Sequence, residues 1–449
     1  MTSGNVWIER YSRVNDLEVI KRLCHRGAQP LFDLDSISIG TACDMIRAEL
    51  GEIFIPTKRC CQIILEVVQQ AQSHAEKNYP DHRTFLTRAY ETDPSFDPWP
   101  PILLTGLAGS GKSQLGKAIV RLLGADSTVQ VDSGHGHVPL VAVSRISVKA
   151  KATLGDILSK LAAPEYSKIT GRRNSVASLD VMSTKWQYLI GVCLIILDEM
   201  QFLTQSEDAN VLIAKVMLRM TYVGPPALII CNYSVLHRLL RRPQEERQRL
   251  LTQTTVLLPD SPDSPDWLSV VDEYQKALPG LFDFSFTSAQ RELWRLCAGL
   301  KRVLVNLVVL AYRQTRLDGR TLVRWVDIEK AYRSTAFSPM REDVELLISE
   351  AFNSRQERQD LRCPLPIEST ELELYKTALR AIRNQMVSSA AAESALNEKE
   401  RQAKESLSAL RANERSAAST PVDRADTKGR SRTTAEDLIK NANRLRQSK

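Results

Sequence analysis

No run of apolar residues in this 449-residue sequence approaches the ~20 positions that a membrane-spanning helix needs. The opening segment, MTSGNVWIERYS, lacks the apolar stretch of a secretory signal peptide. The eight cysteines include no CxxC pair and have no companions at zinc-finger spacing, which disfavours a disulfide framework and a zinc site. We therefore expect a cytoplasmic protein with reduced thiols and no membrane contact.

Net positive charge is small outside the C-terminal end. The net charge is +7, but residues 391–449 hold 13 Lys and Arg against 9 Asp and Glu, so four of the seven charges lie there. Composition therefore gives only weak support for a DNA-binding core. No aromatic residue follows Tyr375, and the last segment is rich in Ala, Ser, Glu and Arg. We expect that segment to be a solvated helix or disordered, because it cannot form a core of its own.

The middle of the chain alternates between apolar runs and helical stretches. This alternation predicts an α/β fold with a central parallel sheet covered on both faces, and the runs are 102–105, 138–143, 192–197 and 227–231. Before it, Thr57 is placed to cap a helix whose apolar face holds Cys60, Ile64, Val67 and Ala71. From residue 264 the chain is helical, with an apolar stripe at Leu293, Leu296, Leu300, Leu304, Leu307 and Ala311.

Composition and pattern suggest four regions. The Pro-rich segment 93–101 is a boundary, since the residue before proline disfavours helix. We predict a helical N-terminal accessory region that binds a partner at 1–100, an α/β core at 101–263, a helical lid at 264–362, and a flexible, partly disordered tail at 363–449.

A phosphate-binding loop follows the first apolar run. The segment 106–113 matches G-x-x-x-x-G-K-[ST] between a predicted strand and a predicted helix. Its glycines allow backbone N–H groups to surround phosphates, while Lys112 reaches the β- and γ-phosphates and Ser113 ligates Mg²⁺. The residues predicted to bind ATP are Gly106, Leu107, Ala108, Gly109, Ser110, Gly111, Lys112, Ser113 and Gln114.

Two further elements follow later predicted strands. Asp198 and Glu199 end the run 192–197, so Asp198 is expected to hold Mg²⁺ and Glu199 to polarise the attacking water. Asn232 closes the run 227–231, where we expect it to position that water, although a simple turn asparagine is the alternative.

Arginines complete the predicted catalytic set. The charged segment 238–250 is compatible with a solvated helix face, yet it also offers an arginine finger that acts on a neighbouring subunit's γ-phosphate. Arg249 is the first candidate and Arg247 the second. Arg302, in the helical region, is expected to fold back onto ATP from the lid.

These elements, in this order, resemble the AAA+ superfamily, and more closely its TnsC/TniB-type ATPase regulators of DNA transposition. The resemblance spans about Pro100 to Pro364, and the length and ending are more similar to the larger TnsC type. Its further motifs are Asp-Glu-Met-Gln201, Cys-Asn-Tyr-Ser234, Arg-Pro-Gln-Glu-Glu-Arg-Gln-Arg-Leu250, Ser-Pro-Asp-Trp267, Gly-Leu-Lys-Arg302 and Arg-Gln-Asp-Leu-Arg-Cys-Pro364.

The resemblance implies an ATPase that assembles on double-stranded DNA as a ring or helical filament of identical subunits. It implies a link between a target selector of the TnsD/TniQ type and transposase subunits of the TnsA/TnsB type, with ATP hydrolysis controlling disassembly. It also implies association with the bacterial nucleoid. In such proteins DNA follows a basic segment after the second strand, here residues 143–153, in which Lys149, Lys151 and Thr153 would contact phosphate. An ordinary exposed loop is the alternative. Arg172, Arg173 and the tail are other possible DNA contacts.

Two other functions share parts of this pattern. A replication initiator or helicase loader has the same fold and motifs, but the sequence contains no recognisable helix-turn-helix or helicase-binding motif. A nucleotide-switched signalling scaffold binds ATP and barely hydrolyses it, which Glu199 and Asn232 argue against.

Overall fold

A computed structural model describes most of the chain as far as residue 400. The described residues are 5–12, 14–92, 94–124, 127–131, 134, 136–163, 175–205, 208–350, 358–366, 369–400, 403 and 406. Met1–Arg401 form one compact unit and Gln402–Lys449 a second. Within the described part of the chain, no helix is both long and apolar enough to span a membrane.

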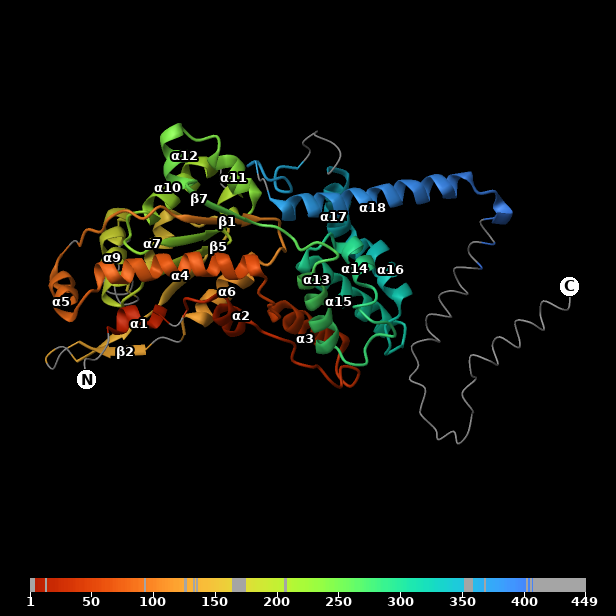
Figure 1. The fold of residues 1–449 in the computed structure, drawn as a ribbon, viewed down its shortest axis with the longest axis horizontal. Coiled ribbons are helices and arrows are strands. Elements are labelled where there is room, and N and C mark those ends of the chain that lie inside the picture. Colours follow the sequence, from red (N-terminus) through yellow and green to blue (C-terminus); the bar gives the residue numbers. More distant parts are fainter. Residues whose placement is uncertain are drawn as a thin grey trace, which may run out of the picture. The chain divides into compact units, whose positions relative to one another are not determined.

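A five-stranded parallel sheet in the order β4-β5-β6-β1-β7 is the centre of the first unit (Figure 1). Because the strands are parallel, all their carboxyl ends lie at one edge of the sheet, where ligands of α/β proteins bind. A separate antiparallel pair consists of β2 and β3. The strands are β1 Ile102–Gly106, β2 Ser127–Gln130, β3 His137–Leu140, β4 Val143–Ser147, β5 Leu194–Asp198, β6 Ala227–Ile230 and β7 Gln253–Leu257.

Alternate residues of the central strands enter two different cores. Leu104 and Ile196 pack on the face covered by the N-terminal helices and α6, whereas Leu103 and Ile195 pack on the opposite face. Helices that cover the sheet or follow its strands are α6 Lys112–Leu122, α7 Leu154–Leu161, α9 Val176–Leu189, α10 Ala209–Met220, α11 Tyr233–Leu239 and α12 Gln244–Leu250, with the 3-10 turn η1 Met200–Gln205. Covered on both faces, the central strands are almost entirely apolar, as expected for a parallel sheet.

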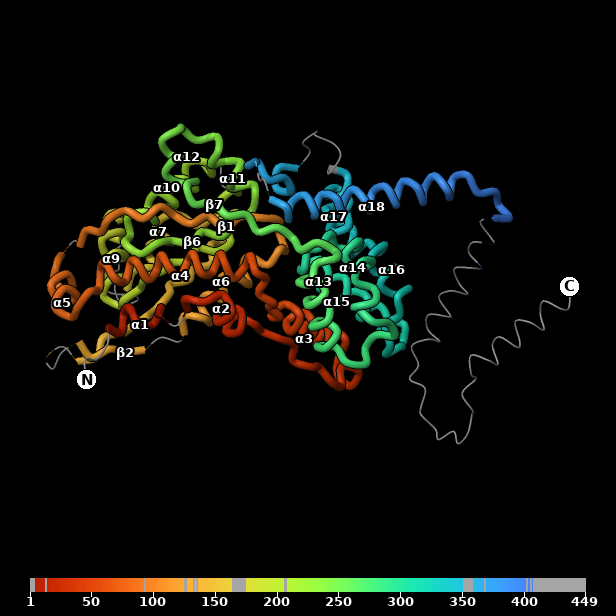
Figure 2. The backbone as a smooth tube through the Cα atoms, in the orientation of Figure 1, coloured from red at the N-terminus to blue at the C-terminus, as the bar shows by residue number. Residues whose placement is uncertain are grey.

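The N-terminal helices share the cores of the sheet and of the lid. They are α1 Val6–Ser12, α2 Leu17–Cys24, α3 Ile39–Glu52, α4 Lys58–Asn78 and α5 His82–Tyr90. As predicted, Thr57 caps α4 by accepting a hydrogen bond from the Cys60 amide. Helix α4 packs into the core beneath the sheet, while α3 packs into the lid core. Figure 2 shows α3 beside α13 and α15, far away in sequence. The partner-binding role of residues 1–100 stays a prediction.

A helical lid follows β7. Its elements are α13 Pro265–Ala277, α14 Gln290–Cys297, α15 Lys301–Leu317, α16 Trp325–Arg333, η2 Thr335–Phe337, α17 Ser338–Glu350 and α18 Thr370–Ala395. The start of α18 buries Tyr375 and Leu379 in the lid core, whereas most residues after position 383 are exposed. These features confirm the predicted α/β fold class, with a central parallel sheet, a helical N-terminal extension and a C-terminal helical lid.

Two details differ from the expectation. The run 138–143 does not form one strand, because β3 ends at Leu140 and the sheet strand β4 begins at Val143. Being an edge strand, β4 carries polar residues and is not marked by an apolar run. The apolar stripe is buried throughout but belongs to two helices, since left-handed Ala298 and Gly299 separate α14 from α15. That break determines where Arg302 lies.

Candidate nucleotide-binding site

The loop 106–113 joins β1 to α6 at the carboxyl edge of the sheet. Two of its glycines have positive φ angles and close neighbours. A Cβ at Gly106 (φ 153°) would lie 2.4 Å from the Leu257 carbonyl oxygen of β7, and one at Gly109 (φ 84°) would lie 2.9 Å from the Arg302 Cβ. A side chain at either position would therefore displace β7 or the lid.

The Lys112 ammonium lies inside this loop. Its Nζ donates hydrogen bonds to the carbonyl oxygens of Gly106 at 2.9 Å and Leu107 at 2.7 Å. Burial lowers the pKa of Lys112 to about 8, because the charged form loses its hydration. A bound phosphate would replace that hydration with negative charge, so the lysine is placed to gain from a polyanion.

Asp198 ends β5 and is almost completely buried. Its Oδ1 accepts hydrogen bonds from the Ser113 hydroxyl at 3.1 Å and from the Glu199 amide at 2.9 Å. Its Oδ2 pairs with the Arg145 guanidinium of β4 at 2.8 Å. Ser113 and Asp198 thus bring two hard oxygen donors together, and this donor set fits Mg²⁺.

Glu199 directly follows β5, and Asn232 follows the neighbouring strand β6. Glu199 has a left-handed backbone, with φ 64°, and its carboxylate accepts a hydrogen bond from the Gln201 amide nitrogen. The Asn232 Oδ1 caps α11, accepting from the Ser234 amide at 3.1 Å and the Ser234 hydroxyl at 2.5 Å. The helix-capping role of Asn232 is therefore observed, and its role toward water stays a prediction.

A cavity of about 410 Å³ collects these groups. Among the predicted residues, it is lined by Ala108, Gly109, Gly111, Lys112, Ser113, Gln114, Asp198, Glu199, Asn232 and Arg302. Gly106, Leu107 and Ser110 do not line it. Gly106 pairs with β7, and Leu107 and Ser110 are buried behind the loop. Arg302 lies in the first turn of α15, next to the loop, where its backbone amide approaches the Gly109 carbonyl oxygen at 3.4 Å.

The remaining lining is largely apolar and comes from segments that the sequence analysis did not connect with the site. Its apolar members include Leu50, Ile53, Phe54 and Ile55, at or after the end of α3, with Val270, Tyr274 and Val305 of the lid. Polar members of this part of the lining include Arg47, Lys301 and Asn306. Apolar walls next to convergent polar groups are usual for small-molecule sites. No continuous motif marks these residues, because they converge only when α3 packs on the lid. Arg145 was missed for a related reason, since its partner Asp198 lies 53 residues away in sequence. Gln201 was named only as part of a motif and was given no role in the site, although its partner Glu199 is two residues away.

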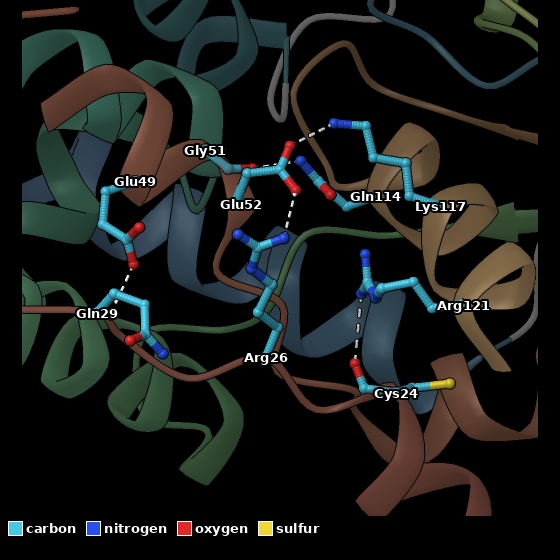
Figure 3. Close-up of polar contacts among 9 residues, drawn as sticks. All are labelled: Cys24, Arg26, Gln29, Glu49, Gly51, Glu52, Gln114, Lys117 and Arg121. Carbon is cyan, nitrogen blue, oxygen red and sulfur yellow. Dashed lines mark hydrogen bonds and ion pairs between the residues drawn. The ribbon is translucent and has the colours of Figure 1, made fainter. Parts of the chain in front are cut away.

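Polar contacts attach the end of α3 to the P-loop helix (Figure 3). The Glu52 carboxylate lies between Lys117 of α6, at 2.5 Å, and Arg26, at 3.0 Å. The Gln114 side-chain amide donates to the Gly51 carbonyl oxygen. Burial opposes ionisation of Glu52, but Lys117 lowers its pKa below the ordinary value. The apolar wall is thus fixed to the same helix that begins with Lys112.

The other predicted residues lie outside the cavity. Arg249 is on α12 and pairs with Glu245 at 2.9 Å, with 56% of its side chain exposed. Lys149 and Lys151 are exposed in the turn after β4, where Lys151 is left-handed (φ 60°). Thr153 caps α7 through a capping box with Asp156. Arg247 is exposed on α12, whereas Arg172, Arg173 and the tail beyond 406 lie outside the described residues.

Comparison with known proteins gives similar folds only. No family model and no curated protein matches the chain. Among solved structures, it is similar to ORC1 of Aeropyrum pernix in complex with DNA (18% identity, TM-score 0.41), covering 66% of this chain and 69% of that one. It is also similar to Cdc6p of Pyrobaculum aerophilum, with 14% identity and a TM-score of 0.38, covering 71% of this chain and 84% of that one. A third is A. pernix ORC2 (15%, 0.37), covering 59% of this chain and just under two thirds, 66%, of that one. Similarities of this size transfer no activity to the chain.

Proposed function

We propose that this protein binds Mg-ATP in the cavity and hydrolyses it. The observation that supports this most directly is that one cavity contains the P-loop lysine, the Ser113–Asp198 pair, Glu199, Asn232 and the lid residue Arg302. Lys112 would bind the β- and γ-phosphates, and Ser113 and Asp198 would hold Mg²⁺, which neutralises phosphate charge when bound. Glu199 would polarise the attacking water. The apolar wall would enclose the adenine ring of the nucleotide.

We further propose that the ATPase acts on double-stranded DNA as a TnsC-type regulator of transposition. The motifs that resemble that family support this, as do the exposed lysines of the turn after β4. The surface position of Arg249 is compatible with a finger that serves a neighbouring subunit. The assembly would connect a target selector to a transposase, and hydrolysis would release it from DNA.

The experiment compares Lys112→Ala with Lys276→Ala, measuring ATP affinity by equilibrium titration. Lys276 is a matched control because it is an exposed lysine of α13, paired with Asp272 and Glu273 away from the cavity lining. We expect Lys112→Ala to abolish detectable ATP binding and ATP-dependent assembly on duplex DNA in negative-stain images. Equal ATP affinity in the two variants would contradict the site.

The same images separate the alternatives. A transposition regulator should form rings or filaments on duplex DNA that require ATP and retain a TnsB-type transposase. An initiator or helicase loader should bind DNA without retaining that transposase, and a signalling scaffold should ignore DNA.

A further inference from the structure

Both carboxylate oxygens of Asp198 have partners within the chain. Its side chain is only 4% exposed, and both oxygens are engaged, Oδ1 by Ser113 and the Glu199 amide and Oδ2 by Arg145. A buried carboxylate without an opposite charge is costly. Arg145 supplies that charge by direct contact, and the nearby Lys112 ammonium also interacts with Asp198 through its charge.

The Arg145 contact differs from a structural ion pair of the same chemistry. In the lid, Asp327 (3% exposed) pairs with Arg320 (30% exposed) at 2.7 Å, nearly the same burial and distance as Asp198 with Arg145 (29% exposed) at 2.8 Å. The lid partners are seven residues apart, and Asp327 also accepts from the Arg324 amide of its own helix cap. Asp198 and Arg145 are 53 residues apart, and Asp198 lines the cavity.

A metal ion and Arg145 need the same carboxylate. Mg²⁺ binds such an oxygen directly or through a coordinated water, and it requires near-octahedral geometry. A dication at the Ser113–Asp198 pair would repel a guanidinium that stays on Oδ2, because both carry positive charge within a few ångströms of each other. Arg145 lies on the edge strand β4 and is partly exposed, so it has solvent into which to withdraw.

We propose that Arg145 is an internal counter-ion of Asp198 that competes with the metal ion for this carboxylate. Arg145 therefore raises the metal concentration at which the site binds nucleotide tightly. Without metal, it also keeps the negative charge of Asp198 from repelling the phosphates. This inference rests on the proposed nucleotide-binding function, and it makes Arg145 a positioning residue.

The test measures ADP affinity in EDTA and in Mg²⁺ for the full chain and for Arg145→Gln. Removing the guanidinium takes away the counter-ion that contacts Asp198. ADP binding in EDTA should therefore weaken, and the gain in ADP affinity on adding Mg²⁺ should increase. The quantity compared is the dissociation constant for ADP in EDTA divided by that in Mg²⁺. We expect this ratio to be roughly ten-fold or more higher in the variant than in wild type. A Mn²⁺ titration followed by electron paramagnetic resonance, with ADP present, should show tighter metal binding in the variant.

Arg320→Gln is the matched control, since it breaks a pair of equal burial away from the cavity lining. It should lower thermal stability and leave the ratio at the wild-type value. If Arg145→Gln fails to fold, the same ratio is measured for Arg145→Lys. A ratio above wild type supports the inference, and an unchanged ratio contradicts it. An unchanged ratio in a folded Arg145→Gln protein that still binds ADP overturns the role of Arg145 alone. Absence of ADP binding by wild type in both buffers overturns the proposed function itself.

Discussion

Polar groups facing the cavity and polar groups on the outer surface differ in how they are held. At the cavity, Ser113 donates to Asp198, and Arg145, which is not part of the lining, pairs with the same aspartate from a third segment. On the outside, Arg249 and Thr153 contact residues of their own helix or cap, Glu245 and Asp156. The inner set is assembled within one chain. The contacts described for Arg249 and Thr153 are local, and the proposed function would add DNA or a second copy as their partner.

The largest effect tests whether the outer set depends on a second subunit. In an assembled ATPase, Arg249→Ala should lower the rate by ~10³-fold or more, because an arginine finger stabilises transition-state charge. ATP affinity of the free subunit should be nearly unchanged. Mixing this variant with Lys112→Ala should restore part of the activity, since one interface then combines an intact P-loop with an intact Arg249.

Arg291→Ala is the control for that mixture, because Arg291 is also exposed and ion-paired, with Asp263 at 2.7 Å. It should retain activity. No recovery in a mixture that demonstrably co-assembles would exclude Arg249, and Arg247 would be tested next.

The next effect concerns the inner set. Glu199→Gln keeps the size of the side chain but removes the base, so turnover should fall by ~10²-fold or more while ATP still binds. Retention on DNA, followed by filter binding in ATP, should last longer than for wild type. Glu371→Gln, on the exposed first turn of α18, serves as the control and should behave as wild type. Faster DNA release by Glu199→Gln would contradict the proposed role of hydrolysis.

The inner set was predictable where its residues follow one another in sequence. A strand, a glycine-rich turn and a helix start specify the phosphate loop, and an apolar strand ending in two acids specifies Asp198 and Glu199. A capping threonine followed by a helical apolar face was enough for α4.

What escaped prediction depends on tertiary contacts. The edge strands β4 and β7 contain polar residues, because each has a neighbour on one side only. The left-handed turn at Ala298 places Arg302 against Gly109, and a helical stripe contains no sign of it. The wall formed by Ile53, Phe54 and Ile55 exists because α3 packs on the lid. These residues look like ordinary core in sequence.

A smaller effect should distinguish the two buried aspartates, Asp327 and Asp198, by what each substitution weakens. Asp327→Asn should lower the free energy of unfolding by about 1–3 kcal/mol, because it weakens a local hydrogen-bonded pair, and should leave nucleotide affinity unchanged. Asp198→Asn should show the reverse, losing the Mg²⁺ dependence of ADP binding with a smaller loss of stability. Chemical denaturation and ADP titration measure the two quantities. A nucleotide-binding defect in Asp327→Asn would remove the distinction.

The contribution of Asp327 to the stability of the protein should decrease on acidification. Burial opposes its ionisation, but hydrogen bonds from Arg320 and the Arg324 amide lower its pKa below the ordinary value. A lowered folded pKa stabilises the protein above the unfolded pKa of about 3.9, and this contribution is lost as pH falls through the folded pKa. Asp327→Asn should therefore lose less stability than wild type on acidification over that range.

The smallest expected effect concerns DNA contact by Lys149 and Lys151 on the outer surface. Lys149→Ala combined with Lys151→Ala removes up to two phosphate contacts per subunit, and each contact releases counterions from duplex DNA. The slope of log affinity against log salt should therefore shrink by about 0.9 per contact, equally for all DNA sequences. Thr153→Ala gives a useful comparison, because the Thr153 hydroxyl already caps α7 and its loss should cost about 1 kcal/mol of stability. Hydroxyl contacts release no counterions, so its slope should match that of wild type. If the double lysine variant also keeps the wild-type slope, the DNA contact lies elsewhere on the outer surface, and the turn after β4 is an ordinary exposed loop.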